Sequence, residues 1–409
     1  IFFYKSYIKS VWIGRNMRNV AKKTYDTIVV GGNLNGLIAS AYLATSGKKV
    51  ALFEKKFSLE NESYSLKMHS GLKYSRRPPI ISLPERIILD LNVNVKSKKH
   101  SDVTSITPIY GYNTSIKHLT LGPDPIDSIR HFSSGDAERY KEFLADMKNA
   151  SFSLKQRSCR DILNDYFDFA PLKSTLASKW CFLQGECDPD DPQSGQSLRN
   201  GVLQEIHYPL HLLAEKKENS FVPFIRRRAV SLGVDIFCGG GVREIRFKSH
   251  GVSGVSLANG MECLCSSLLA PNTCSILPQF KMKEGLVDDL YIGLERDFFV
   301  HETYLEKLFN EYPGCPLYLN CESFSPEMSP VLKISLVKSN NPELRVLKVA
   351  VFSLNSRLQE AEVTSLLDKY IPGLSNSVLG THISLPKHYI DNTKMKGLYL
   401  YDGMENIHG

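Results

Sequence analysis

The clearest chemical pattern in the sequence is a glycine-bearing turn that is followed, at the end of the next apolar run, by an acidic residue. The turn reads Gly31-Gly32-Asn33-Leu34-Asn35-Gly36, and Glu54 stands 18 residues after its last glycine. In a dinucleotide-binding fingerprint, the first glycine makes a tight turn, the second lets backbone approach a pyrophosphate, and the third lets a helix pack closely on a strand. Gly31 and Gly36 occupy the first and third positions, with Gly32 after the first, whereas Asn33 occupies the middle one. Glu54 stands where an acidic side chain would bind ribose hydroxyl groups.

The residues around this turn predict a βαβ unit. Residues 25–30 (YDTIVV) are rich in β-branched side chains, as expected of a buried parallel strand. Residues 34–46 carry apolar side chains at helical spacing, and Gly47 is placed to end that helix. Residues 49–54 (KVALFE) read as a second strand. A strand, a helix and a strand in this order cross over right-handedly into a parallel sheet.

The rest of the chain predicts further strands and several helices. Residues 135–165 read as helical, and residues 221–277 read as a helix to Leu232 followed by four strands, with a hairpin at Asn259-Gly260. Four more strand-like runs and a helix over residues 359–370 lie between residues 281 and 390, and a last short strand covers residues 397–401. This order indicates two sheet-containing domains.

The sequence resembles the phytoene-dehydrogenase-like FAD-dependent oxidoreductases. The similarity is carried by YDTIVVGGNLNGLIASAYLATSGKKVALFEKK from Tyr25, and continues in YFDFAPLKSTLAS (166–178), SLGVDIFCGGGVREIRF (231–247) and YIPGLSNSVLG (370–380). It covers nearly the whole chain from Tyr25. The resemblance implies oxidation or isomerisation of an apolar substrate by hydride transfer to FAD. It also implies that the backbone of Val242 pairs with the adenine ring.

The predicted fold class is therefore α/β, with a Rossmann-like parallel sheet of the FAD/NAD(P)-binding type, a β-meander insertion, and a second α+β substrate-type domain on a mixed sheet. The predicted dinucleotide-binding domain is discontinuous and combines residues 25–135, 216–280 and 396–409. The substrate-type domain combines residues 136–215 and 281–395. Residues 1–24 form a basic extension.

Several positions depart from the pattern that the resemblance implies for a bound flavin. Glu60 and Asn61 stand in place of a Gly-Gly pair beside the diphosphate, and Lys216-Lys217-Glu218-Asn219 stand in place of a second glycine-rich turn. After the last strand, Tyr401-Asp402-Gly403-Met404 replace a Gly-Ser-Gly turn that leads into a glycine-rich helix, and the chain ends at Gly409. These changes put long side chains or a repelling carboxylate where bare backbone or a helix N-terminus is required.

We therefore predict that FAD binding and catalysis are lost and that no cofactor is held. The chain would act as a structural or binding subunit of a larger assembly, with proteins as partners. The alternative is an active FAD-dependent oxidoreductase, because Asn33 tolerates the left-handed conformation expected at a glycine position of the turn. Should a dinucleotide be retained, the residues expected to bind it are Gly31, Gly32, Asn33, Gly36, Glu54 and Val242. No catalytic base or acid can be named from spacing.

Charge and composition point to a globular protein with a basic front segment. The chain of 409 residues is 42% hydrophobic and 23% charged, with a net charge of +7, and no apolar run is long enough to span a membrane. Six basic residues precede the first acidic one, Asp26; they are Lys5, Lys9, Arg15, Arg18, Lys22 and Lys23. This pattern resembles a mitochondrial presequence, which predicts a location in the matrix or on the matrix side of the inner membrane. The alternative is that Met17 is the true start.

Other groups of reactive side chains favour structural roles. His207 and His211 are separated by Pro209, Cys263 and Cys265 alternate along one strand, and the acidic cluster at residues 186–191 lacks the glycine of a calcium loop, so no metal site is predicted. The nine cysteines follow no disulfide framework and are expected to be reduced thiols. Arg226, Arg227 and Arg228 read as a solvated helix face, with contact to a partner or to an RNA backbone as the alternative.

Overall fold

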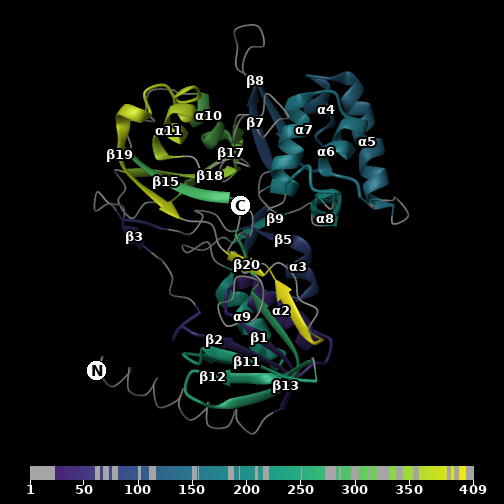
Figure 1. Ribbon diagram of the computed structural model, residues 1–409, viewed down its shortest axis with the longest axis vertical. Helices are drawn as coiled ribbons and strands as arrows, with labels where there is room; N and C mark the ends of the chain where they lie inside the picture. Colours follow the sequence, from purple (N-terminus) through teal and green to yellow (C-terminus); the bar gives the residue numbers. More distant parts are fainter. Residues whose placement is uncertain are drawn as a thin grey trace.

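The computed structural model contains two large sheets, one toward each end of an elongated molecule (Figure 1). It describes residues 24–59, 65–67, 73–75, 82–99, 103–109, 117–149, 154, 156–182, 188–192, 194–207, 211–214, 221–249, 251–271, 282–284, 287–295, 304–312, 315–319, 331–337, 344–352, 359–384, 388–390 and 396–401. Within these ranges, none of the helices has the length and apolar character needed to cross a membrane.

The first sheet is a parallel sheet extended by an antiparallel meander. Its order is β10-β2-β1-β13-β12-β11, and β21 pairs with the far half of β13. The strands are β1 (Thr24–Val30), β2 (Val50–Glu54), β10 (Asp235–Cys238), β11 (Val242–Lys248), β12 (Gly251–Leu257), β13 (Glu262–Pro271) and β21 (Leu398–Tyr401). Strands β10, β2, β1, β13 and β21 run parallel, whereas β12 pairs antiparallel with β11 and β13. This confirms the Rossmann-like sheet with a β-meander.

The hairpin predicted at Asn259-Gly260 joins β12 to β13. Gly260 takes the left-handed conformation with φ of 83°, which a residue without Cβ adopts at little cost. The Oδ1 atom of Asn259 accepts a hydrogen bond from the backbone N–H of Met261 at 3.1 Å. The backbone N–H of Leu257 donates to the carbonyl oxygen of Met261 at 2.8 Å and closes the turn.

Helices α2 (Leu34–Thr45) and α9 (Val222–Ser231) cover one face of the first sheet. Their apolar side chains share a core with the strands; this core contains Val29, Leu37, Leu52 and Ile225, all almost fully buried. The predicted helix end is confirmed, because α2 stops at Thr45 and Gly47 has φ of 83°. The opposite face of the sheet forms a separate core, in which the ring of Phe53 stacks on that of Phe237 at 5.1 Å.

The second sheet is mixed and has helices on both faces. Its order is β19-β15-β18-β17-β16-β7-β8. The strands are β7 (Ser105–Ile109), β8 (Lys117–Leu121), β15 (Val287–Glu295), β16 (Leu317–Leu319), β17 (Val331–Val337), β18 (Leu344–Phe352) and β19 (Val378–Ser384). Strands β7 and β8 lie in the sequence range predicted for the dinucleotide-binding domain, yet they pair within this sheet through β16.

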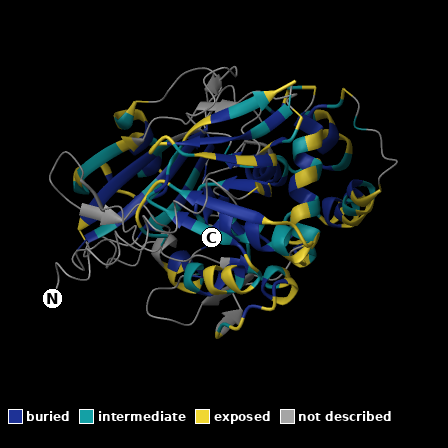
Figure 2. Cartoon of the chain, turned by 90° about the horizontal axis from the view of Figure 1, so that it is seen from below, coloured by how far each residue is buried: buried dark blue, intermediate teal, exposed yellow. Residues whose placement is uncertain are grey.

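The two faces of the second sheet have separate apolar cores. Helices α10 (Tyr304–Glu311) and α11 (Glu360–Asp368) pack on one face, and a 3-10 turn, η3 (Ser375–Ser377), follows α11. A helical group packs on the other face and comprises α4 (Ile126–Arg130), α5 (Ser134–Lys148), α6 (Cys159–Tyr166), α7 (Ala170–Ala177), the π-helical turn η1 (Ser178–Phe182) and α8 (Ser194–His207). Figure 2 shows the inner strands of the described part of the molecule largely buried, with exposed residues on the outer helices, the loops and the edge strands.

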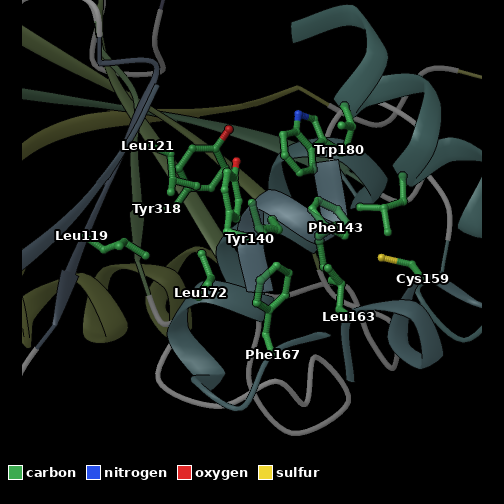
Figure 3. Close-up of a cluster of buried hydrophobic side chains, with 14 of the residues drawn as sticks. Leu119, Leu121, Tyr140, Phe143, Cys159, Leu163, Phe167, Leu172, Trp180 and Tyr318 are labelled. Atoms are coloured by element: carbon green, nitrogen blue, oxygen red, sulfur yellow. The ribbon is translucent and has the colours of Figure 1, made fainter. Parts of the chain in front are cut away.

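The helical group is held by a cluster of large side chains, drawn in Figure 3. Phe143 is fully buried and lies 5.3 Å from the ring of Phe167, edge to face, and Tyr140 lies 6.0 Å from Phe167. The helix predicted over residues 135–165 is present but not continuous. The structure has α5 and α6 instead, because Ser158 and Asp161 form a capping box that starts a new helix at Cys159.

Short strands and one further helix complete the described secondary structure. They are β3 (Ser65–Lys67) paired with β4 (Lys73–Ser75), β9 (His211–Ala214) between β5 (Ser82–Pro84) and β6 (Ser97–Lys99), β14 (Met282–Glu284) paired with β20 (His388–Ile390), and α3 (Glu85–Asp90). Strands β5 and β9 come from distant parts of the sequence and lie between the two large sheets in Figure 1. They therefore connect the two halves of the molecule.

Two glycines in the helical group predict opposite responses to alanine. A Cβ on Gly201 would lie 2.6 Å from the buried indole of Trp180, so Gly201→Ala is expected to destabilise the protein by about 1–3 kcal/mol through overpacking. A Cβ on Gly135 has no neighbour closer than 3.6 Å, so Gly135→Ala is expected to stabilise by about 0.5 kcal/mol. Urea unfolding of both variants measures the difference, and equal effects would contradict the packing of α8 on η1.

Candidate functional site

The turn after β1 has the geometry that two of its glycines predict. Gly31 has φ of 94°, and its N–H donates to the carbonyl oxygen of Phe53 in β2 at 2.8 Å. A Cβ on Gly36 would lie only 2.1 Å from the carbonyl oxygen of Gly31. Residue 36 must therefore be glycine for α2 to approach the end of β1 this closely.

Asn33 caps the helix that follows the turn. Its backbone is extended, with φ of −68° and ψ of 174°, and its Oδ1 accepts the N–H of Gly36 at 2.8 Å. The suggested left-handed conformation of Asn33 is thus wrong, because Gly31 supplies the positive φ and a capping residue must be extended. Anions bind at helix N-termini through free backbone N–H groups. At the N-terminus of α2, the Asn33 side chain already accepts one of these N–H groups.

Glu54 binds the backbone of the same turn. Its Oε2 accepts the N–H of Gly32 at 2.6 Å, and its Oε1 accepts the N–H of Lys56 at 2.9 Å. A Cβ on Gly32 would lie 2.2 Å from Cδ2 of Leu59 and 3.0 Å from Cβ of Glu54. Gly32 therefore lets the residues that follow β2 close over the turn. The sequence did not predict this structural role of Glu54.

The residues after β10 join this edge of the sheet. The N–H of Gly239 donates to Lys56 at 2.7 Å, and the N–H of Gly240 donates to Glu54 at 3.2 Å, both to carbonyl oxygens. Val242 begins β11 two residues later and pairs with Leu257. The predicted residues Gly31, Gly32, Asn33, Gly36, Glu54 and Val242 thus gather at the carboxyl ends of β1, β2 and β10, which is where ligands bind in open α/β sheets.

Arg226 brings a positive charge toward this edge. Burial raises the pKa of the Cys238 thiol at the end of β10, while Arg226 lowers it and Glu54 raises it, so both charged groups lie near that sulfur. Arg226 is exposed on α9. The only sequence signal for this placement was the triple-arginine run.

The arginine run does not form one uniform basic surface. The guanidinium of Arg227 lies 4.9 Å from the ring centroid of Phe224, and Arg228 Nε donates to the carbonyl oxygen of Leu91 at 2.5 Å. Three consecutive helical residues point about 100° apart, which explains their separate contacts. Arg226 is the member of the run whose charge acts on Cys238 at the end of β10.

The other predicted groups have structural surroundings where they are described. Cys263 and Cys265 are buried in β13, and burial raises the pKa of each thiol, to about 11 and about 12. Arg160 donates from Nε and Nη2 to the carboxylate of Asp190, which ties the acidic loop to α6. Among the residues placed by the structure, no three His, Cys, Asp or Glu side chains gather as metal ligands, and the described free thiols are those of Cys159, Cys238, Cys263, Cys265 and Cys315.

Several sequence predictions lie outside the described residues. They concern the basic segment before Thr24, Glu60 and Asn61, the stretch 216–219, and the residues after Tyr401. They remain predictions.

These features define a Rossmann-like fold of the FAD-binding oxidoreductase type. They are a parallel sheet with a glycine turn after β1, an acidic residue at the end of β2, and a meander between β10 and β13. The chain is 23% identical to pyridine nucleotide-disulfide oxidoreductase domain-containing protein 2 of Rattus norvegicus, over 90% of this chain and 82% of that protein. The mouse protein of the same name is 24% identical over 94% of this chain and 85% of its own length. The resemblance predicted from sequence is confirmed as a distant homology. No protein-family model matches the chain.

Solved structures share the fold at low identity. An oxidoreductase from Methanosarcina mazei superimposes with a TM-score of 0.58 and 12% identity, covering 92% of this chain and 94% of its own. A Rab GDI from Plasmodium falciparum superimposes with a TM-score of 0.58 and 13% identity, covering 93% of this chain and 94% of its own. An oxidoreductase and a Rab GDI thus have the same fold, so the fold alone does not assign an activity.

The hydrogen bonds of Glu54 predict that its carboxylate stabilises the turn. Glu54→Gln is expected to destabilise the protein by about 1–2 kcal/mol, because an amide offers one acceptor oxygen to two backbone N–H groups. Glu244→Gln, on an exposed position of β11 in the same sheet, is the matched control and is expected to change stability little. Urea unfolding curves measure both variants. Equal midpoints would show that Glu54 does not hold the turn.

Proposed function

We propose that this chain keeps the fold of an FAD-dependent oxidoreductase but has lost FAD binding and catalysis. We further propose that it serves as a structural or binding subunit of a larger mitochondrial assembly, with proteins as partners. The observation that carries this proposal is the hydrogen bonding of the turn after β1. The N–H of Gly36 is accepted by Asn33, and the N–H of Gly32 is accepted by Glu54.

A diphosphate needs the same donors at the same place. Phosphates bind at helix N-termini through backbone N–H groups and the helix dipole. A phosphate at α2 would have to displace the Asn33 side chain, and losing such a cap costs roughly 1 kcal/mol. The phosphate would also carry its charge toward the carboxylate of Glu54. A glycine at position 33 has no side chain, so a phosphate would neither have to displace a cap nor collide with side-chain atoms there.

The sequence supports the same proposal at other positions. Glu60 and Asn61 stand where the resemblance to the phytoene-dehydrogenase-like family implies two glycines. Residues 216–219 read Lys-Lys-Glu-Asn where it implies a second glycine-rich turn. Each replacement adds a long or charged side chain where a dinucleotide requires close backbone approach. The basic residues before Asp26 support the mitochondrial location.

The alternative function is an active FAD-dependent oxidoreductase acting on an apolar substrate. It is favoured by one observation, the position of the Glu54 carboxylate at the end of β2 beside the glycine turn, where an acidic side chain would bind ribose hydroxyl groups. Each oxygen of Glu54 also keeps a second lone pair, which could accept a ribose hydroxyl group. The absorbance spectrum and native mass spectrum of the purified chain separate the two functions.

Under the first proposal, the wild-type chain mixed with FAD and then desalted shows no flavin absorbance bands and no mass increase. Asn33→Gly is expected to bind FAD at least about tenfold more tightly than wild type, because it removes the competing oxygen and the side-chain bulk. Quenching of flavin fluorescence measures the affinity. Stoichiometric FAD in the wild type would overturn the proposal.

A matched variant controls for the change of residue type. Asn259→Gly alters an asparagine in the β12–β13 turn, away from the glycine turn, and is expected to leave FAD affinity unchanged. An equal gain in both glycine variants would show that the effect is not local to α2. Sedimentation of the tagged chain from mitochondrial extracts tests the subunit role, since a lone protein would sediment at the mass of the tagged chain alone.

A further inference from the structure

A group of charged side chains lies on the face of the second sheet opposite α10 and α11. The strand register puts Lys333 of β17 directly opposite both Tyr318 of β16 and Ala350 of β18. Asp289 of β15 faces Ala350 from the other side. The Nζ atom of Lys348 lies 2.9 Å from Oδ2 of Asp289, so these two charges neutralise each other.

A second ion pair approaches the same face from the helical group. Lys179 of η1 is buried, and its Nζ lies 2.6 Å from Oε1 of Glu205 in α8. The same Nζ donates to Oγ1 of Thr104 at 2.7 Å. Burial raises the pKa of Tyr140, and the Glu205 carboxylate raises it further, so this tyrosine lies beside the ion pair. Tyr140 is labelled in Figure 3. This pair is also electrically neutral.

Lys333 is the fifth charged side chain of this group and belongs to neither ion pair. Its backbone pairs with the neighbouring strands, but its Nζ atom has neither a hydrogen bond nor an ion pair with any residue that the structure describes, although the residue is only partly exposed. Burial lowers the pKa of Lys333 to about 8, and the ammonium groups of Lys348 and Lys179 act in the same direction, against Asp289. At neutral pH the amine is still mainly protonated, so the group of five charged side chains holds one uncompensated positive charge.

Two buried oxygen atoms beside the Lys179 pair also lack partners within the described part of the chain. They are Oγ of Ser105, a fully buried residue, and Oε2 of Glu205. Ser105 and Thr107, two residues apart in β7, share one face of the sheet, and Thr107 contacts Thr175 of α7 in the helical group at 2.8 Å. Glu205 belongs to the same helical group, so both oxygen atoms lie on this side of the sheet. Buried polar atoms without a partner are uncommon in folded proteins, and a water molecule, an ion or a polar ligand can supply the missing hydrogen bond.

We propose that this junction between the second sheet and the helical group binds a small monocarboxylate, whose acid group accepts hydrogen bonds from Lys333 and Ser105. A single negative charge neutralises the group, whereas a phosphate dianion would leave an excess negative charge in a partly desolvated place. The free oxygen of Glu205 accepts a hydroxyl group of the ligand or a water bound with it. This proposal is independent of whether FAD binds at the first sheet.

Butyrate is the probe, with butyramide as its neutral analogue. Butyrate is expected to raise the melting temperature of the full-length protein with saturable dose dependence, and butyramide is not. Lys333→Met should weaken butyrate binding at least about tenfold, because it removes a charge-assisted hydrogen bond. Lys369→Met changes an exposed lysine after α11 and should bind butyrate as wild type does. Equal stabilisation by butyrate and butyramide, or wild-type affinity in Lys333→Met, would overturn the proposal.

Two further measurements protect the test against a variant that fails to fold. Ser105→Ala removes an unpaired buried hydroxyl group, so it should preserve folding and still weaken butyrate binding severalfold. In wild-type protein carrying ¹³C-dimethylated lysines, butyrate should shift the Lys333 resonance and raise its titration midpoint, because an anion stabilises the ammonium form. An unchanged Lys333 resonance at saturating butyrate would contradict the site.

Discussion

The close approach of α2 to the end of β1 is the constraint on which the first half of the molecule depends. The carbonyl oxygen of Gly31 occupies the space where a Cβ of residue 36 would lie, at 2.1 Å. Because the helix is held at this distance, its apolar face meets β1 and β2, and Val29, Leu37 and Leu52 are removed from water together. A larger residue at position 36 would separate the helix from the sheet and expose that core.

Strand β13 connects β1 to the other strands of the first sheet. Its first residues pair antiparallel with β12, while its remaining length pairs parallel with β1 and β21. One continuous strand thus joins the meander to the parallel sheet. The chain after β10 must therefore return to the glycine turn, which brings Gly239, Gly240 and Val242 beside Glu54. The gathering of these residues is a consequence of strand order.

Local sequence signals predicted the elements whose causes are local. Gly47 marked the end of α2, and Asn259-Gly260 marked the hairpin, because each acts through its own backbone conformation. The start of α6 was available in the same way from Ser158 and Asp161, a capping box that lies inside the range predicted as one helix. The pairing of Ile106 with Leu317 had no local signal, because the two strands are joined only through distant chain segments.

The site residues followed the same rule. Spacing alone placed Gly31, Gly36 and Glu54 at one sheet edge. The hydrogen bonds of Glu54 to Gly32 and Lys56 depend on a side-chain rotamer and on how the chain after β2 closes over the turn. Residue spacing therefore predicts where a site residue lies in the fold, but it does not predict which atoms its side chain contacts.

The glycine motif combines two demands that this chain satisfies differently. Gly36 serves the packing of helix on strand, a demand that persists in any protein with this fold, because a Cβ there would collide with backbone. The middle glycine of the motif serves only the approach of a ligand. Asn33, which stands at that position here, contributes a helix cap and so adds stability to the fold itself. If selection acts on the fold and no longer on the ligand, the packing glycine should persist and the ligand glycine should be replaced by a residue that stabilises the turn. The combination of Gly36 with Asn33 is the pattern that the proposed loss of FAD binding predicts.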